Sequence, residues 1–260
     1  MRMGLFDRLF PETHVEGADG IRILDTPTAM NLRGLGGWPT PDGVTQAHRF
    51  IRAGSTRYIS GRDIKYLREY GVTHVLDLRG RGETPQMTCA FANRPGFTWK
   101  NVSLYDFDLS DPKIVAIQKD SDYLARGYLS MLGRQEAIRQ VFSFFAAVPL
   151  EQCVLFHCAA GMDRTGVTAM LLEGLVGVSR DDITRDYLYS FAPMHDVDRY
   201  VECGELPERM RSGRMSSLLD VIGQAYDTLI DAYGSIAAYL SACGVTAAEL
   251  DALRARLLQP

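Results

Sequence analysis

The chain has 260 residues, 46% of them hydrophobic, which is enough to bury a full core and to form one elaborated domain. Its formal net charge is −4, without a run of five like charges, which argues against nucleic acid or an anionic membrane surface as the main partner. No stretch approaches an apolar membrane span, so we expect no integral membrane association.

The N-terminus and the cysteines bear on the compartment. The first ten residues, MRMGLFDRLF, place Asp7 and Arg8 inside their only apolar stretch, so we expect no signal-peptide hydrophobic region there. The five cysteines are widely spaced, with no CxxC pair, which favours reduced thiols. We predict a cytoplasmic protein. Export without a cleaved signal would leave the same pattern, and that alternative stays open.

The first third of the chain alternates strand-like and helical patterns. Residues 21–54 are rich in Gly, Pro and Thr, which predicts short strands and turns. Ser60 is in position to cap a helix that Gly71 ends. Residues 74–78 then predict a buried strand, and residues 97–104 predict the next one.

The middle of the chain supplies an acidic loop, helices and a central strand. Residues 105–112 form a turn-rich loop with three carboxylates, of the kind that often carries function. The apolar residues of 114–148 keep a helical period, and Gly133 predicts a break between two helices. Residues 153–157 are a short apolar run after a proline, which predicts a central strand buried on both faces.

Helical patterns dominate the C-terminal part. They cover residues 181–191 and 215–233, and a last helix begins with a capping box from Thr246 to Glu249. The alternation of elements predicts an α/β fold, with a central, mostly parallel sheet flanked by helices and with extra C-terminal helices. We predict a single domain over residues 1–260, in which 1–20 form an N-terminal extension and 180–260 a helical elaboration.

The loop after the central strand, HCAAGMDRTG at residues 157–166, carries the chemistry. It precedes an apolar helix over 167–175, which puts Cys158 at the carboxyl edge of the sheet, where α/β folds bind ligands. The small residues after Cys158 let the backbone curl with its N–H groups inward, as an anion cradle for a phosphate. The residues that we assign to this cradle are His157, Ala159, Ala160, Gly161, Met162, Thr165 and Gly166.

The cradle explains why a cysteine stands there. Inward N–H dipoles, the helix N-terminus and Arg164 favour a thiolate, which is a ready nucleophile. Arg164 can hold two phosphate oxygens through its planar fork and take up charge in the transition state. We predict hydrolysis in two steps through a cysteinyl-phosphate on Cys158, with Thr165 donating its hydroxyl to the leaving sulfur. His157 is expected to orient the loop through a backbone hydrogen bond.

The pattern His-Cys-x-x-Gly-x-x-Arg-Thr-Gly resembles the signature of the protein-tyrosine-phosphatase superfamily. Asp163 before Arg164 makes the loop similar to that of bacterial tyrosine, dual-specificity and lipid phosphatases, as do NLRGLGG at 31–37 and VLDLR at 75–79. The resemblance covers roughly residues 20–180. It implies a tyrosine-phosphatase-like fold, a phosphorylated protein or a small phosphorylated substrate, and no cofactor. Met162 replaces the lysine of those relatives, which removes a cation near a second phosphate.

A proton donor for the leaving group is expected in one of two places. Asp163 is favoured because the loop resembles that of myotubularin-type lipid phosphatases there; alternatively its carboxylate only braces the loop. Asp106 or Asp108 would match the mobile acid loop of ordinary tyrosine phosphatases, or else belong to a solvated turn. Asp77 and Arg79 follow a strand end and either line the pocket or form a buried ion pair that supports the loop.

The favoured function is that of a protein-tyrosine or dual-specificity phosphatase. Two alternatives stay open: a phosphoinositide or inositol-phosphate phosphatase, and a phospho-ligand binding module with little turnover. A rhodanese-like sulfurtransferase also places a cysteine in such a loop, but the flanking His and Arg-Thr-Gly fit phosphatases better. The other histidines are scattered singly, so we expect no metal site. The oligomeric state stays open.

Overall fold

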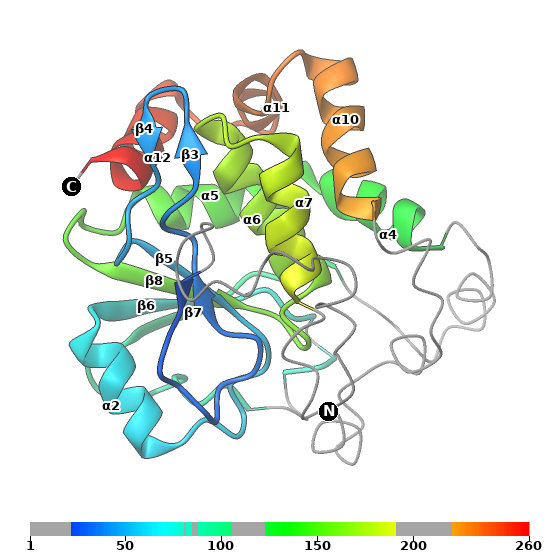
Figure 1. Cartoon of the computed structure of the whole chain (residues 1–260). Coiled ribbons are helices and arrows are strands. Elements are labelled where there is room, and N and C mark those ends of the chain that lie inside the picture. The colour runs from blue at the N-terminus through cyan, green and yellow to red at the C-terminus, as the bar shows by residue number, and fades with distance from the viewer. Residues whose placement is uncertain (1–21, 81, 85–87, 106–122, 191–219, 260) are drawn as a thin grey trace, which may run out of the picture.

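The structure, a computed structural model, describes residues 22–80, 82–84, 88–105, 123–190 and 220–259, and in them a six-stranded sheet runs in the order β1-β2-β5-β8-β6-β7 (Figure 1). The strands of this sheet are β1 (Arg22–Ile23), β2 (Arg33–Gly34), β5 (Phe50–Ala53), β6 (Val72–Asp77), β7 (Thr98–Asn101) and β8 (Cys153–His157). The pairs β5–β8, β8–β6 and β6–β7 are parallel, whereas β1 and β2 add an antiparallel edge. A separate hairpin joins β3 (Pro39–Thr40) to β4 (Gly43–Val44).

Helices cover both faces of the sheet, which confirms the predicted α/β class with a mostly parallel sheet. They are α2 (Gly61–Glu69), α4 (Tyr123–Leu132), α5 (Gln135–Ala146), α6 (Asp163–Leu175), α7 (Arg180–Tyr189), α10 (Val221–Tyr233), α11 (Ile236–Ala242) and α12 (Ala247–Leu258). In Figure 1, α2 lies below the sheet and the later helices gather above it. None of the helices in the described ranges combines the length and the apolar character that crossing a membrane requires.

The central strand β8 is buried on both faces, as its apolar sequence predicts. Val154 and Phe156 belong to the larger core cluster, on the side of α6, whereas Cys153 and Leu155 belong to the smaller one, on the side of α2. All four side chains are fully buried. Because successive side chains of a strand point to opposite faces, one five-residue strand joins the two layers of core beneath the site.

The predicted helix caps are present. The Ser60 hydroxyl accepts the Asp63 N–H at 3.1 Å, and Gly71, with φ of +108°, follows the end of α2. Thr246 and Glu249 form the predicted capping box of α12. These signals are local in sequence, which is why they predict the helix ends well.

Two boundaries differ from the prediction. Helix α6 begins at Asp163 rather than at residue 167, because the Gly166 N–H already bonds to the Met162 carbonyl at 2.7 Å and closes a helical turn. Strand β7 ends at Asn101, earlier than predicted. The start of the helix predicted over 215–233 and the N-terminal extension lie outside the described residues, and the single domain over 1–260 stays a prediction.

Candidate active site

The loop between β8 and α6 is held from behind by its carbonyl oxygens. Three successive carbonyls each accept a hydrogen bond from outside the loop: Ala159 from the Ser55 N–H (2.7 Å), Ala160 from Asn31 Nδ2 (3.1 Å) and Gly161 from Arg52 Nη2 (2.8 Å). Since the C=O and N–H of a trans peptide point in opposite directions, the N–H groups of these three peptides face away from those partners. The Gly161 N–H donates to Cys158 Sγ at 3.2 Å, which places the sulfur on the N–H side of the loop, as the predicted cradle requires.

Gly161 is the residue on which this curl depends. Its φ is +73°, a conformation that other residues adopt rarely. A Cβ atom there would lie 2.6 Å from the backbone nitrogen of Gly54 and 2.7 Å from the carbonyl group of Ala53. No side chain fits between the loop and the end of β5, so both the backbone conformation and the close approach require glycine.

The nucleophile candidate and the arginine lie together, both buried, with Cys158 1% exposed and Arg164 5% exposed. Arg164 stands in the first turn of α6, and both of its terminal nitrogens donate to the carboxylate of Glu83, one of them at 2.9 Å. The Gly80 N–H also donates to Glu83, at 2.8 Å, so the acid is itself held by its own turn. Burial alone would lower the pKa of Arg164, but Glu83 and Cys158 raise it, and the guanidinium stays charged.

Glu83 was absent from the sequence-based site. It follows β6 within the run Arg79-Gly-Arg-Gly-Glu83, at the same carboxyl edge of the sheet as Cys158. An acidic residue just beyond the end of a central parallel strand is the signal that would have placed it, because such strand ends converge at the ligand edge.

Behind the loop lies a buried charge cluster that joins β2, β5 and α7. Asp186 accepts from Arg33 Nε at 2.8 Å and also from Arg52 Nη1, and all three side chains are at most 1% exposed. Burial, with Arg52 nearby, lowers the pKa of Arg33 to about 10. Burial alone would raise the pKa of Asp186, but the two arginines hold it below its usual range. Neither Arg52 nor Asp186 is predicted from the sequence, because no local pattern pairs residues 134 positions apart.

Asp163 is buried at the start of α6, with 8% of its surface exposed. The Tyr128 hydroxyl donates to its Oδ1 at 2.9 Å and lies 2.8 Å from the Tyr187 hydroxyl. Burial and the neighbouring Asp163 raise the pKa of Tyr128 well above its usual range, so this hydroxyl keeps its proton. The competing acids, Asp106 and Asp108, lie outside the described residues.

Two residues that we assigned to the cradle direct their side chains elsewhere. The Thr165 hydroxyl donates to the Ala53 carbonyl at 3.4 Å, rather than to the sulfur as expected, because the helical turn aims it at the end of β5. The Met162 side chain is 2% exposed and belongs to the larger core cluster, as its apolar character favours, so it is not presented to a ligand. Gly166 packs against the Tyr187 ring, which an added Cβ would meet at 3.0 Å.

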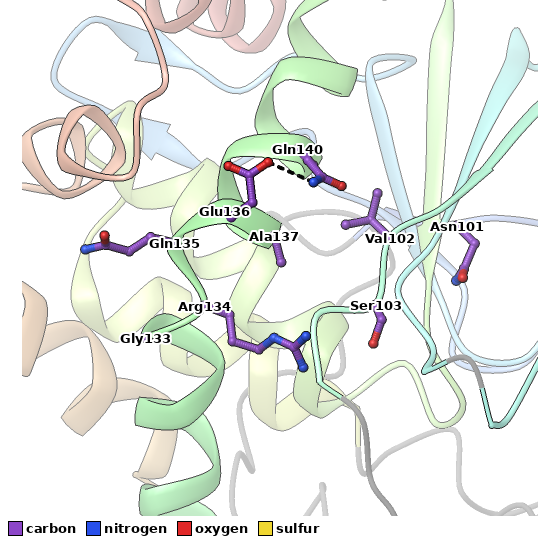
Figure 2. Close-up of a pocket in the computed structure, with 9 residues that line it drawn as sticks. All are labelled: Asn101, Val102, Ser103, Gly133, Arg134, Gln135, Glu136, Ala137 and Gln140. Carbon is purple, nitrogen blue, oxygen red and sulfur yellow. Dashed lines mark hydrogen bonds between the residues drawn. The ribbon is translucent and has the colours of Figure 1, made fainter.

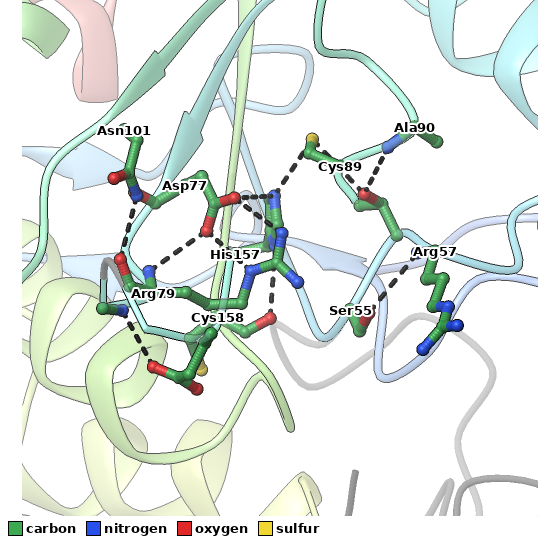
Figure 3. A network of polar contacts seen from close by, with 12 residues as sticks. Ser55, Arg57, Asp77, Arg79, Cys89, Ala90, Asn101, His157 and Cys158 are labelled. Atoms are coloured by element: carbon green, nitrogen blue, oxygen red, sulfur yellow. Dashed lines mark hydrogen bonds and ion pairs between the residues drawn. The ribbon is translucent and has the colours of Figure 1, made fainter. Parts of the chain in front are cut away.

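Asp77 and Arg79 form a buried ion pair, one of the two predicted arrangements (Figure 3). Arg79 Nη2 donates to Asp77 Oδ2 at 2.7 Å and Nε to Oδ1 at 2.9 Å. His157 lies beside them, with Nδ1 3.2 Å from the Cys158 carbonyl, a backbone contact of the kind predicted from the sequence. Its Nε2 faces Cys89 Sγ at 3.5 Å and Asp77 Oδ2 at 3.8 Å.

Asp77, Cys89 and His157 are also the one group of metal-ligand types that the described residues bring within 4.8 Å of one another. Both carboxylate oxygens of Asp77 already accept hydrogen bonds from Arg79. The positive charge of Arg79 would repel a metal ion bound at the same carboxylate. The group is therefore built as an ion-pair cluster and not as a preformed metal site.

A pocket of about 660 Å³ opens beside the site (Figure 2). Residues 101–103, which leave β7, line one side of it, and residues 133–137 with Gln140 line the other. Its lining contains no residue of the loop at 157–166. Asn101 links the pocket to the ion pair, because its Nδ2 donates to the carbonyls of Asp77 and Arg79 at 2.8 and 2.9 Å.

Comparison with known proteins places this site in context. A family model described as the tyrosine phosphatase family matches residues 24–259. A tyrosine-protein phosphatase of Nostoc commune is 31% identical over 231 residues, which cover 82% of this chain and 75% of that protein. A putative tyrosine-protein phosphatase of Cupriavidus necator is 33% identical over 63% of this chain and 61% of its own length. The triple specificity protein phosphatase PtpB of Mycobacterium tuberculosis is 30% identical over 48% of this chain and 50% of its own.

Proposed function

The chain belongs to the tyrosine phosphatase family of cysteine-dependent phosphatases. We propose that it dephosphorylates proteins, with phosphotyrosine as the preferred residue, through a cysteinyl-phosphate on Cys158. The observation that carries this proposal is the cradle: the Gly161 N–H donates to Cys158 Sγ, and Arg164 is buried in the following helical turn. Backbone donors and a fixed cation around one sulfur bind a phosphate dianion next to the nucleophile.

In the first step, Cys158 Sγ attacks phosphorus while the bond from phosphorus to the leaving oxygen breaks. The cradle N–H groups and Arg164 take up the charge on the equatorial oxygens. Glu83 fixes the plane of the guanidinium through two hydrogen bonds, which reduces the entropy lost when Arg164 binds phosphate.

We propose that Asp163 donates the proton that the leaving oxygen takes up in the first step. Its place in the first turn of α6, directly before Arg164, supports this role, and the hydrogen bond from Tyr128 holds its carboxyl group in position. In the second step, Asp163 takes a proton from water, the water oxygen attacks phosphorus, and the bond from sulfur to phosphorus breaks. Inorganic phosphate leaves and the thiolate is restored.

The substrate preference rests on Met162. Its side chain packs in the core, so the loop presents only one side-chain cation, Arg164, to a ligand. That supports a substrate with a single terminal phosphate, such as phosphotyrosine, over a phosphoinositide with a second phosphate near the first. The names of the relatives, two tyrosine-protein phosphatases and one triple specificity protein phosphatase, support the same preference with tolerance for other monoesters. Widely spaced cysteines support a cytoplasmic location.

The test is hydrolysis of an aryl phosphate, phosphotyrosine and phosphoserine peptides, and phosphoinositides, with EDTA present throughout. We expect wild-type turnover on the aryl phosphate and the phosphotyrosine peptide, and at least about a 10³-fold loss in Cys158→Ser. Cys153→Ser is the matched control, since Cys153 is a buried thiol on the same chain segment and its pKa is raised to about 12 by burial.

Turnover that persists in Cys158→Ser would remove the thiol mechanism. Preference for phosphoinositides would replace the proposed substrate class. Tight phosphopeptide binding without turnover would identify a binding module, and persulfide formation from thiosulfate would identify a sulfurtransferase.

A further inference from the structure

A second cysteine lies behind the nucleophile and has no part in the two steps above. Cys89 comes from the loop before β7, is 5% exposed, and places its Sγ 3.5 Å from Nε2 of the fully buried His157 (Figure 3). His157 directly precedes Cys158, so whatever sets the charge of its imidazole acts one residue from the nucleophile.

The contacts of the imidazole limit where its protons reside. Nδ1 lies 3.2 Å from the Cys158 carbonyl, which only accepts hydrogen bonds, so Nδ1 carries a hydrogen. Nε2 faces the Cys89 sulfur and the Asp77 carboxylate, and the carboxylate is an acceptor as well. A hydrogen on Nε2 would be donated to Cys89 Sγ at 3.5 Å, and the Asp77 carboxylate at 3.8 Å would stabilise the positive charge of the imidazolium that results.

The surroundings of Cys89 complete the same arrangement. Thr56 accepts the Ala90 N–H at 3.2 Å through its hydroxyl oxygen and donates its own hydrogen to Cys89 Sγ at 3.5 Å. The sulfur thus receives a hydrogen bond on one side and faces a ring nitrogen on the other. A sulfur in such a position is suited to the thiolate form, which accepts both.

We propose that Cys89 is a positioning residue, whose thiolate pairs with the His157 imidazolium and so keeps a positive charge directly behind Cys158. The proton that leaves Cys89 Sγ resides on His157 Nε2, and no other group gains or loses one. The proposal rests on the function proposed above, in which Cys158 is the nucleophile. The charge behind it favours the Cys158 thiolate and thereby the first step.

The charges that face the imidazole balance. Asp77 at the end of β6 is paired with Arg79 from the turn that follows, and the proposed thiolate is paired with the imidazolium, so the buried cluster is neutral. Glu83, which also lies near Arg79, is paired with Arg164.

The titration directions agree with this pairing. Burial alone would lower the pKa of His157, but Asp77 and Cys89 raise it above its usual value. Burial alone would raise the pKa of Cys89, but His157 and Thr56 lower it. Cys153 shows what burial does without a histidine partner, because the pKa of its thiol is raised to about 12.

The experiment measures the rate at which iodoacetamide alkylates Cys158 as a function of pH, with EDTA present. Peptide mass spectrometry resolves the alkylation of each cysteine. The proteins compared are the wild type, Cys89→Ala, Cys89→Ser and Cys153→Ser. In both Cys89 variants, we expect the midpoint of the Cys158 alkylation profile to move upward by about one pH unit, because the imidazolium is lost. Below the midpoint, alkylation should then be roughly tenfold slower. The acid limb of kcat/KM should move with it. Cys153→Ser should keep the wild-type profile.

Serine separates charge from hydrogen bonding, since its hydroxyl can bond to Nε2 but stays neutral. A wild-type midpoint in Cys89→Ser, or in both Cys89 variants, would overturn the ion pair. For variants that do not fold, nitrogen NMR of the wild-type histidines gives the answer: two protonated ring nitrogens on His157 at pH 7 support the proposal, and a bare Nε2 overturns it. Failure of the proposed function is distinct, because it would appear as turnover in Cys158→Ser.

Discussion

On its sulfur side, the phosphate loop presents Cys158, the Gly161 N–H and Arg164, which lie within seven consecutive residues. On its carbonyl side, the same loop is held by Asn31, Ser55 and Arg52, and the last of these is bound in turn by Asp186 from α7. The sulfur side is continuous in sequence, whereas on the carbonyl side Arg52 and Asp186 lie 134 positions apart. The comparison teaches that the groups proposed to bind phosphate and the groups that hold the loop are encoded separately, so substitutions should separate turnover from stability.

The largest effect is expected from Arg164→Lys on the sulfur side. Lysine keeps the positive charge beside Glu83 but cannot hold two phosphate oxygens in one plane, so kcat should fall by about 10³-fold or more. The free energy of unfolding should stay close to the wild-type value. Parallel kinetics and urea denaturation check this, and equal losses of activity and stability would break the distinction between the two sides.

Next comes Asp186→Asn on the carbonyl side, which leaves Arg33 and Arg52 buried without their anion. We expect the free energy of unfolding to fall by about 3–5 kcal/mol. Because the pKa of Asp186 is depressed in the folded state, its contribution is present above the usual carboxyl range and is lost as pH falls below it. Wild-type stability should therefore drop at acid pH more steeply than that of the variant.

Urea denaturation at several pH values measures both quantities. Asp251→Asn is the matched control, since Asp251 is 75% exposed in its pair with Arg254 and its loss should be close to neutral. A loss from Asp186→Asn no larger than that of the control would show that the cluster does not hold the loop.

A smaller effect, of about 10²-fold, is expected from Asp163→Asn. The loss should appear with a poor leaving group, such as an alkyl phosphate, and should be weak with a nitrophenyl phosphate, whose leaving group needs no proton. Stability should change less than turnover, although Asp163 bonds to Tyr128. Equal losses with both substrates would remove the general acid role and leave Asp163 as a brace of the loop.

The smallest effect concerns Glu173, which lies on α6 beside the charge cluster. Within the described residues neither of its carboxylate oxygens meets a hydrogen-bond donor, and burial raises its pKa well above the usual range. In the unfolded chain the Glu173 carboxyl group ionises above about pH 4.5, whereas in the folded protein it stays neutral. Glu173 therefore lowers the free energy of unfolding as pH rises. Glu173→Gln should stabilise the protein by at least about 1.4 kcal/mol at pH 8 and leave it unchanged at pH 4.

Thermal or urea unfolding at the two pH values gives the comparison. A variant that is less stable than the wild type at pH 8 would show that Glu173 is ionised and paired with the arginines, and the carbonyl side would then carry one more ion pair.

Local patterns predicted the sulfur side and most of the fold. Strand β8 and the caps at Ser60 and Thr246 depend on residues a few positions apart, and each was predicted in place. The start of α6 was predicted late, because three of its first four residues, Asp163, Thr165 and Gly166, are weak helix formers that are common in loops.

The carbonyl side and Glu83 could not be read in the same way. The sequence does not distinguish a buried arginine such as Arg52 from an exposed one, and its partner Asp186 follows 134 residues later. Only the fold brings them together. The Cys89–His157 contact, across 68 residues, escaped for the same reason.

The central claim is that phosphate passes through Cys158. The most direct measurement is rapid acid quenching during turnover of an aryl phosphate, followed by peptide mapping for a covalently bound phosphoryl group. We predict phosphate on the peptide that contains Cys158, at a level that is reached before steady-state turnover. Phosphate on another residue, or turnover without any covalent intermediate, would contradict the account.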